Sequence, residues 1–394
     1  MATQKQLIVN AIPLTRVHTG ISRYLRCLYS QMEKQHTNEL DIWYFDGTKL
    51  SRSMPKGPQN LRKWTRLTDM FWKLPWPAAL ALRLAAHTKT EHRFYKLARG
   101  FDLYHEAGFF PMQVPPGLRT LFTVHDISLL RFPEHHPRER VIFHNMFWRS
   151  RWAGVDEFLT VSRFSKQELQ AVLPPGPYKI TVTPLAHDPS VFYPRSRSQL
   201  LDFTRQHGLP PRYFLFVGSG DPRKNLPLIP KALHASGIDI CLVVAGWSGW
   251  SQEQQPTNVH HAGYMSDEEL ALLYSGALAL IFPSSYEGFG LPVLEAMACG
   301  CPVVTSQRAS LPEVAADAAC YVQNPEDIDE LGRILGQIAQ SPGRRQELRE
   351  RGLARAAKFS WAQTARLTYA TLMDASAPKQ TQNDSLAEKK KCRS

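Results

Sequence analysis

Short apolar segments of strand length alternate with helix-like segments along this chain, and the alternation begins a second time near the middle. The first series of apolar segments covers residues 6–12, 40–45, 101–106, 120–126, 156–162 and 179–184. The second series covers residues 212–220, 238–246, 277–282, 301–305 and 320–322. Strands separated by helices are typical of parallel sheets that are covered by helices on both faces. The pattern therefore predicts an α/β chain with two doubly wound, Rossmann-like domains.

Residues 186–211 interrupt this pattern, because the stretch is rich in Pro, Ser and Arg and is typical of a loop. We place the boundary there, with one domain over residues 1–190 and a second over 191–358. Residues 359–375 are expected to form an amphipathic helix, and the polar residues 376–394 are expected to be disordered. Doubly wound domains bind ligands at the carboxyl ends of their strands, so the sequence predicts a cleft shared by the two domains.

Composition and charge narrow the classes of partner. The 394 residues are 43% hydrophobic and 21% charged, as in a globular protein large enough for two cores. The formal net charge of +12 suits a phosphorylated ligand, a membrane surface or a nucleic acid. No nucleic-acid-binding motif accompanies that charge, so we expect no nucleic acid as partner. Six cysteines in this length do not indicate a disulfide framework.

The sequence shows neither a signal peptide nor a run of about 20 apolar residues. We therefore expect a cytoplasmic protein, with peripheral contact at the cytoplasmic face of a membrane left open. Residues 52–99 bear on that question, because they interleave basic and aromatic side chains. Such a stretch docks on anionic lipid head groups, or it covers the first sheet with Trp64, Phe71 and Trp72 in the core. We favour the helical cover, which is compatible with a basic face toward lipid.

Two glutamates, Glu287 and Glu295, stand eight positions apart across a glycine-bearing turn. An apolar run of strand length precedes the turn, and a helix start follows it. Strand, glycine loop and helix start together cradle phosphate, because free N–H groups and the helix dipole point at the anion. Gly288 and Gly290 allow the backbone to approach a ligand, and the two carboxylates add acceptors for sugar hydroxyls. The segment predicts a nucleotide-sugar site; a plain turn with two solvated glutamates is the alternative.

The whole string SSYEGFGLPVLEAMACGCPVV, residues 284–304, resembles the E-x7-E motif of the retaining glycosyltransferases of family 4, which have the GT-B fold. The resemblance implies that Glu287 lies beside the donor sugar and that Glu295 accepts hydrogen bonds from the nucleotide ribose. In the GT-B fold the last helix crosses back to the first domain, so the resemblance implies the same for residues 359–375. It covers nearly the whole chain and is densest from 210 to 325.

The same resemblance assigns backbone groups to the donor. Phe289, Gly290 and Leu291 are expected to bind substrate at the start of the helix. Helix-start amides from Leu291 to Val293 are expected to stabilise the charge on the departing diphosphate.

Residues 217–228 follow a predicted strand and carry two adjacent cations, Arg223 and Lys224. A dinucleotide-binding fingerprint is rejected, because its third glycine falls on Arg223. Family 4 proteins carry a lysine at the place of Lys224, in contact with donor phosphates, and often an arginine at the place of Ser219. Arg223 is therefore a candidate for the missing positive charge at the diphosphate. A solvated turn is the alternative for both cations.

His125 and Asp126 end a predicted strand, which places both at the cleft. The string 121–137 resembles the acceptor-side loop of family 4 enzymes, commonly mannosyl- or rhamnosyl-transferases, in which the matching His lies close to the donor sugar. Asp126 is expected to bind substrate there. Gly20 matches the first glycine loop of the family, beside the donor phosphates and the acceptor. Tyr264 falls in the segment whose backbone meets the nucleotide base.

The expected reaction is transfer of a hexose from a nucleoside diphosphate sugar to a glycan or lipid-linked glycan, with retention, in cell-surface polysaccharide synthesis. The catalytic residues would be His125, Lys224 and Glu287. The resemblance favours GDP-mannose or GDP-rhamnose as donor, followed by UDP-glucose. The string Asp327-Ile-Asp329 is read as a surface helix start, so we expect neither a metal ion nor a cofactor. An inactive glycan- or nucleotide-binding protein and a nucleotide-sugar epimerase on the same fold are the alternatives.

Overall fold

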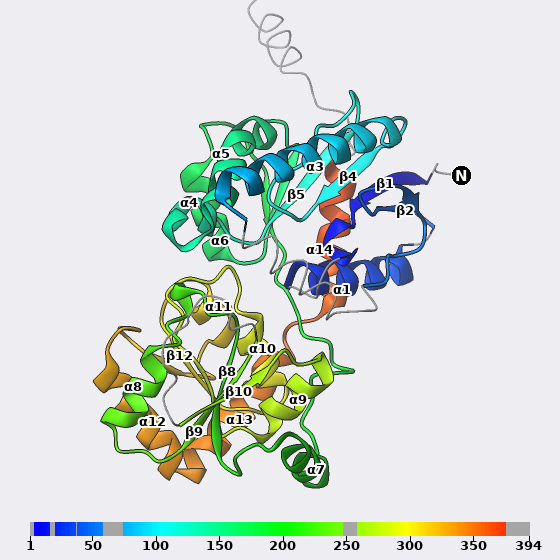
Figure 1. The fold of residues 1–394 in the computed structure, drawn as a ribbon. Coiled ribbons are helices and arrows are strands. Elements are labelled where there is room, and N and C mark those ends of the chain that lie inside the picture. Colours follow the sequence, from blue (N-terminus) through cyan, green and yellow to red (C-terminus); the bar gives the residue numbers. More distant parts are fainter. Residues whose placement is uncertain (1–3, 16–19, 37, 58–73, 247–257, 376–394) are drawn as a thin grey trace, which may run out of the picture.

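A computed structural model of the chain describes residues 4–15, 20–36, 38–57, 74–246 and 258–375. These residues form two helix-covered sheets, one above the other in Figure 1. We call the part built on the first sheet the N-terminal lobe and the part built on the second sheet the C-terminal lobe.

The N-terminal lobe contains a seven-stranded sheet with the strand order β3-β2-β1-β4-β5-β6-β7. Neighbouring strands pair in parallel, except that the edge strand β3 is antiparallel to β2. Its strands are β1 Lys5–Asn10, β2 Leu40–Phe45, β3 Leu50–Ser51, β4 Leu103–Glu106, β5 Arg119–Val124, β6 Glu157–Thr160 and β7 Ile180–Val182. The order reverses between β1 and β4, which is the point where doubly wound sheets bind ligands.

The C-terminal lobe contains a six-stranded parallel sheet with the order β10-β9-β8-β11-β12-β13. Its strands are β8 Tyr213–Val217, β9 Cys241–Ala245, β10 Val259–Gly263, β11 Leu280–Phe282, β12 Val303–Ser306 and β13 Cys320–Val322. All residues of β8, β11 and β12 are buried, because helices cover both faces of the sheet. The order reverses between β8 and β11. The expectation of two doubly wound α/β units is confirmed.

Helices connect the strands in both lobes. Those of the N-terminal lobe are α1 Gly20–Gln35, α3 Trp76–Leu97, α4 Ser128–Arg131, α5 Arg138–Ala153 and α6 Arg163–Val172. The rest are α7 Arg197–His207, α8 Leu228–Ala235, α9 Asp267–Gly276, α10 Leu291–Ala298, α11 Leu311–Ala315, α12 Ile328–Gln340, α13 Pro342–Ala356 and α14 Trp361–Ala375. Single 3-10 turns are η1 Ile12–Thr15, η2 Pro133–His135 and η3 Pro222–Lys224. Among the described residues, no helix has the length and apolarity needed to cross a membrane.

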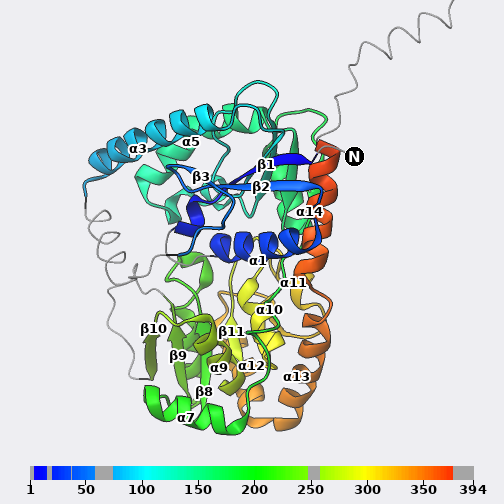
Figure 2. The ribbon, with the colours of Figure 1, turned by 90° about the vertical axis from the view of Figure 1, so that its right-hand side faces the viewer.

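The last helix, α14, packs on the N-terminal lobe although it follows the C-terminal lobe in sequence. Figures 1 and 2 show it in red beside α1. The ring of Trp361 lies 6.1 Å from that of Tyr24 on α1. At the other end of the helix, Arg119 Nε of β5 donates to the Ala375 carbonyl oxygen at 3.0 Å. The chain therefore crosses between the lobes twice.

The structure corrects some local predictions. Residues 186–211 are not all loop, because they contain α7, whose capping box joins Ser196 and Gln199. A second capping box joins Ser266 and Glu269 at the start of α9. Asp327 caps α12, as expected for a surface helix start.

Part of the basic and aromatic stretch 52–99 forms α3, which packs against α5. Two ion pairs join these helices, Arg83 to Glu139 at 3.4 Å and Arg151 to Glu91 at 2.9 Å. Trp64, Phe71 and Trp72 lie outside the described residues, as does the tail 376–394.

Candidate active site

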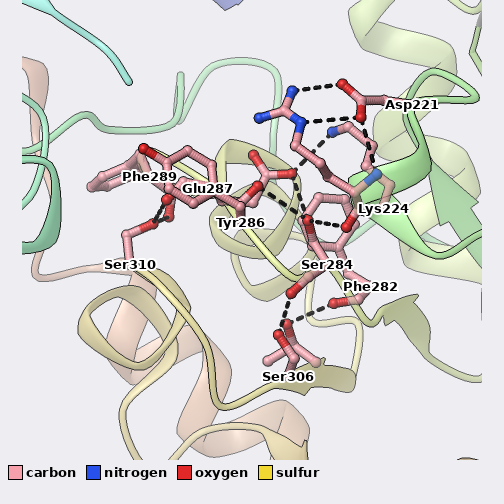
Figure 3. A network of polar contacts seen from close by, with 11 residues as sticks. Asp221, Lys224, Phe282, Ser284, Tyr286, Glu287, Phe289, Ser306 and Ser310 are labelled. Carbon is pink, nitrogen blue, oxygen red and sulfur yellow. Dashed lines mark hydrogen bonds and ion pairs between the residues drawn. The ribbon is translucent and has the colours of Figure 1, made fainter. Parts of the chain in front are cut away.

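The loops that follow β8 and β11 meet at the switch point of the second sheet, and they carry Lys224 and Glu287. Lys224 Nζ lies 3.1 Å from Glu287 Oε1, and the hydroxyl of Ser284 donates to the same oxygen at 3.1 Å. Figure 3 shows the lysine and the carboxylate pointing toward each other. Each of the two charged side chains is 17% exposed, so both remain open to a ligand. The pairing holds Glu287 in one orientation with its second oxygen available.

Serine hydroxyls fix the main chain of the same loop. Ser310 Oγ donates to the carbonyl oxygens of Glu287 and Phe289, at 2.8 and 2.9 Å (Figure 3). Ser306 Oγ donates to the Ser284 carbonyl oxygen. The motif alone did not indicate these serines, since they lie beyond it in sequence. By bonding these carbonyl oxygens, the two serines fix the conformation of the loop.

The turn before α10 provides free backbone donors, although fewer than expected at the helix itself. Gly290 adopts a φ of 100° and caps α10. Within the described residues, the N–H groups of Gly288, Phe289, Gly290 and Leu291 have no hydrogen-bond acceptor. The expectation for the Val293 amide is wrong, because this N–H donates to the Gly290 carbonyl at 3.0 Å. The donors therefore come from the glycine turn and only the first residue of the helix.

Arg223 lies next to Lys224 but is already paired. Its Nε and Nη2 donate to the two carboxylate oxygens of Asp221, at 3.0 and 2.5 Å. Its guanidinium lies 5.8 Å from the centre of the Tyr286 ring. Burial opposes the charge, but the contact with Asp221 raises the pKa of Arg223. Asp221 was not among the residues predicted for the site, and this bidentate pair offsets the charge that Arg223 was expected to bring.

Glu295 lies on α10 and is 1% exposed. The Tyr274 hydroxyl donates to its Oε2 at 3.2 Å, and Arg23 of α1 contacts its Oε1. Burial raises the pKa of Glu295, while Arg23 opposes that rise. Tyr264 follows β10 and is 51% exposed. Partial burial raises the pKa of its phenol, and the nearby carboxylate of Asp267 raises it further. The second glutamate of the motif is therefore a buried carboxylate near the lobe boundary.

His125 and Asp126 follow β5 and face the same boundary from the N-terminal lobe. His125 Nε2 is buried without a hydrogen-bond partner among the described residues. The imidazole stands edge-on to Tyr24 at 4.9 Å, and burial lowers the pKa of His125 to about 4, so the ring is neutral at pH 7. Asp126 accepts from the Ser128 amide at 2.8 Å and is otherwise exposed.

The loop of Glu287 rests directly on this N-terminal strand end. Ser162 and Ser165 donate through their hydroxyls to the Gly288 carbonyl oxygen, at 2.7 and 3.0 Å. A β-carbon on Gly288 would lie 1.9 Å from the carbonyl oxygen of His125. By contrast, a β-carbon on Gly20, the first residue of α1, would meet no atom of the described residues within 4 Å.

A cavity of about 470 Å³ opens beside His125 and extends into the N-terminal lobe. It is lined by residues of both lobes, among them Phe109, His125, Asp126, His136, Arg140, His144, Trp152, Asp221 and Arg223. His144 and Trp152 are almost fully buried, and each has a ring nitrogen without a partner among the described residues. Burial lowers the pKa of His144 to about 4. The described part of the lining thus combines aromatic and imidazole rings with two arginines and two aspartates.

Comparison with known proteins agrees with this geometry. Residues 18–191 match the family model described as Glycosyltransferase Family 4, and residues 201–355 match the one described as Glycosyl transferases group 1. O-antigen chain mannosyltransferase B of Escherichia coli is 35% identical over 66% of this chain and 71% of its own length. A GDP-mannose-dependent alpha-(1-6)-phosphatidylinositol dimannoside mannosyltransferase of Mycobacterium tuberculosis is 31% identical over 56% of this chain and 58% of its own length.

Solved structures share the fold at low identity. Sucrose-phosphate synthase from Thermosynechococcus elongatus superposes with a TM-score of 0.69 at 18% identity, over 95% of this chain and all of that one. WaaG, a glycosyltransferase involved in lipopolysaccharide biosynthesis, gives a TM-score of 0.64 at 14% identity, over 93% of this chain and 99% of its own. These likenesses show that the fold is GT-B, as the sequence predicted.

Proposed function

Because the chain belongs to glycosyltransferase family 4, we propose that it transfers a hexose from a nucleoside diphosphate sugar to a hydroxyl of a glycan or lipid-linked glycan, with retention. The donor proposed first is GDP-mannose or GDP-rhamnose, since relatives of the chain include O-antigen mannosyltransferases and a GDP-mannose-dependent enzyme. Residues 1–190 would bind the acceptor and residues 191–358 the donor.

The observation that carries the proposal is the pair of Lys224 and Glu287 beside unsatisfied backbone amides at the switch point of the second sheet. Lys224 and the amides from Gly288 to Leu291 would hold the diphosphate. Glu287 would accept from a hydroxyl of the donor sugar. Glu295 would accept from the ribose, and the backbone near Tyr264 would meet the base. Arg223 forms a bidentate pair with Asp221 and Lys224 is paired with Glu287, so each of the two cations already has a carboxylate partner.

In the proposed step, the bond between the anomeric carbon and the diphosphate oxygen breaks while a bond to the acceptor oxygen forms. The acceptor proton passes to an oxygen of the departing phosphate. Negative charge grows on the diphosphate during this step, and Lys224 with the amides stabilises it; losing one such donor typically costs on the order of 3–4 kcal/mol. Neutral His125 lines the cavity, where its Nε2 would bond a hydroxyl of the reacting sugar.

The cavity beside His125 is the proposed acceptor site. Among the described residues that line the cavity, two arginines, Arg140 and Arg223, stand with two aspartates, Asp126 and Asp221. The unpartnered ring nitrogens of His144 and Trp152 favour a ligand with hydroxyls. We therefore propose that the acceptor presents an uncharged sugar to this site.

The test incubates the purified protein with GDP-mannose, GDP-rhamnose or UDP-glucose, with and without neutral mannosides as acceptors. The expected result is acceptor-dependent release of nucleoside diphosphate from one donor, with the anomeric configuration of the product, read by NMR, matching that of the donor. Conversion of a donor without acceptor would instead indicate an epimerase. Absence of nucleotide binding in a thermal-shift panel of GDP, UDP and ADP would overturn the proposal.

A further inference from the structure

Glu295 is a buried carboxylate whose positive partner comes from the opposite lobe. It lies among buried apolar residues on α10, where an unpaired charge is costly. Among the described residues of its own lobe, Glu295 has one side-chain partner, the Tyr274 hydroxyl at 3.2 Å from Oε2. Arg23 Nη1, on α1, contacts Oε1, and within the described residues it is the only cation paired with this carboxylate. Two lone-pair directions of the carboxylate remain for hydroxyls of a ligand.

Arg23 contacts two other residues outside its own lobe besides Glu295. Its Nη2 contacts Asp267 Oδ1 at the start of α9, and its guanidinium lies 5.4 Å from the centre of the Phe192 ring. Figures 1 and 2 show α1 on the side of the N-terminal lobe that faces the C-terminal lobe. The fork of a guanidinium can bridge two carboxylates at once, whereas a lysine ammonium acts as a single point charge. This side chain therefore links the first turn of α1 to α9 and α10 together.

We infer that Arg23 is a positioning residue, which fixes Glu295 from the opposite lobe and makes ribose binding depend on closure of the two lobes. The inference rests on the ribose-binding role proposed for Glu295. With the lobes apart, Glu295 would stay buried without its cation and would accept poorly from a diol. With the lobes together, Arg23 favours the charged form of the carboxylate and orients it. Since coupling between two equilibria is reciprocal, nucleotide binding must favour closure by the same factor.

A gate is the opposite hypothesis, in which Arg23 occupies the carboxylate and keeps the ribose out. The two differ in the sign of one measurement. If Arg23 positions Glu295, its removal weakens nucleotide binding; if it blocks Glu295, its removal strengthens binding.

The experiment titrates GDP and UDP calorimetrically into the wild type, Arg23→Met, Arg23→Lys and Asp267→Asn. Arg26→Met is the matched control, because Arg26 is a partly buried arginine of α1 that makes no ion pair among the described residues. We expect Arg23→Met to weaken binding of the preferred nucleotide by about tenfold or more. Arg23→Lys should recover part of the loss, Asp267→Asn should lose less, and Arg26→Met should match the wild type.

Two further readouts distinguish positioning from a general structural role. Small-angle scattering of the nucleotide-free protein should show a larger radius of gyration for Arg23→Met than for Arg26→Met. In transfer assays the KM for the donor should rise more than kcat falls. Tighter nucleotide binding by Arg23→Met overturns the inference in favour of a gate, and unchanged affinity with unchanged scattering overturns it outright. If Arg23→Met fails to fold, wild-type affinity in Arg23→Lys overturns it. A wild type that binds no nucleotide overturns the proposed function, and the inference with it.

Discussion

Gly288 and His125 meet across the two lobes so closely that no side chain fits at the glycine. Its β-carbon would stand 1.9 Å from the His125 carbonyl oxygen, a backbone atom that cannot turn aside. Ser162 and Ser165, at the start of α6 in the N-terminal lobe, donate to the Gly288 carbonyl oxygen. The loop that carries Glu287 is thus positioned by the N-terminal lobe as well as by its own.

Gly288→Ala should therefore reduce transfer while each lobe stays folded. The added methyl group forces the lobes apart, and a displacement of about 1 Å at a reacting centre can lower the rate about a hundredfold. Steady-state kinetics measure the loss, and circular dichroism checks the fold. Gly343→Ala is the control, because a β-carbon there meets nothing within 4 Å. Equal kcat in both variants would contradict the role given to this contact.

Lys224→Met should lower kcat by roughly 10²–10³-fold, the usual loss when one preorganised donor to a developing anion is removed. Binding of the nucleoside diphosphate should weaken as well, because the lysine also faces the ground-state diphosphate. The matched variant is Lys231→Met, an exposed lysine on α8. Undiminished turnover in Lys224→Met would remove this residue from the site.

Phe109→Ala should raise the KM for a neutral mannoside by roughly fivefold, because the ring is 42% exposed at the acceptor cavity and offers an apolar face to a sugar. GDP binding should not change, since we propose that the donor binds to the other lobe. Leu201→Ala on α7 removes an equally exposed apolar side chain outside the cavity and serves as the control. A loss of donor affinity in Phe109→Ala would place the ring elsewhere in the reaction.

Acidification should destabilise the protein between pH 6.5 and about 4. Burial lowers the pKa of His105 to about 3 and that of His144 to about 4. The unfolded chain therefore binds protons in this range that the folded chain does not, and stability falls as pH falls. Each histidine should cost about 2 kcal/mol at pH 5 relative to pH 7. Urea unfolding at both pH values measures the difference, which should be smaller in His144→Gln. A difference as large as that of the wild type would show that His144 does not titrate in this way.

Local patterns allowed prediction of the sheets and of the glycine turn, because each is determined by residues adjacent in sequence. The alternation of apolar runs located the strands of both sheets except β3 and β10, which are edge strands: β3 has only two residues and β10 is partly exposed. The helix α7 was missed, although the pair of Ser196 and Gln199 offered a capping signal within the Ser-rich stretch.

Contacts between distant residues could not be predicted in this way. Arg23 meets Glu295 across 272 positions, and no periodicity relates an arginine of α1 to a carboxylate of α10. The role of Ser310 could not be predicted either, because its hydroxyl donates to carbonyl oxygens that come near it only when β11 and β12 pair. Arg223 and Asp221 both lie in the segment 217–228, but their positions in the sequence do not show that their side chains pair. The structure shows that pairing.

The packing of α14 on α1 also has a consequence for how the protein is made. Tyr24 and β5 receive their cover from Trp361 and the rest of a helix that is synthesised after both sheets. Chains emerge from the ribosome with the N-terminal end first. The N-terminal lobe therefore cannot complete its folding, and keeps an apolar face uncovered, until residue 375 has been released. The last folding step of the N-terminal lobe is thus also the step that attaches the end of the C-terminal lobe to it.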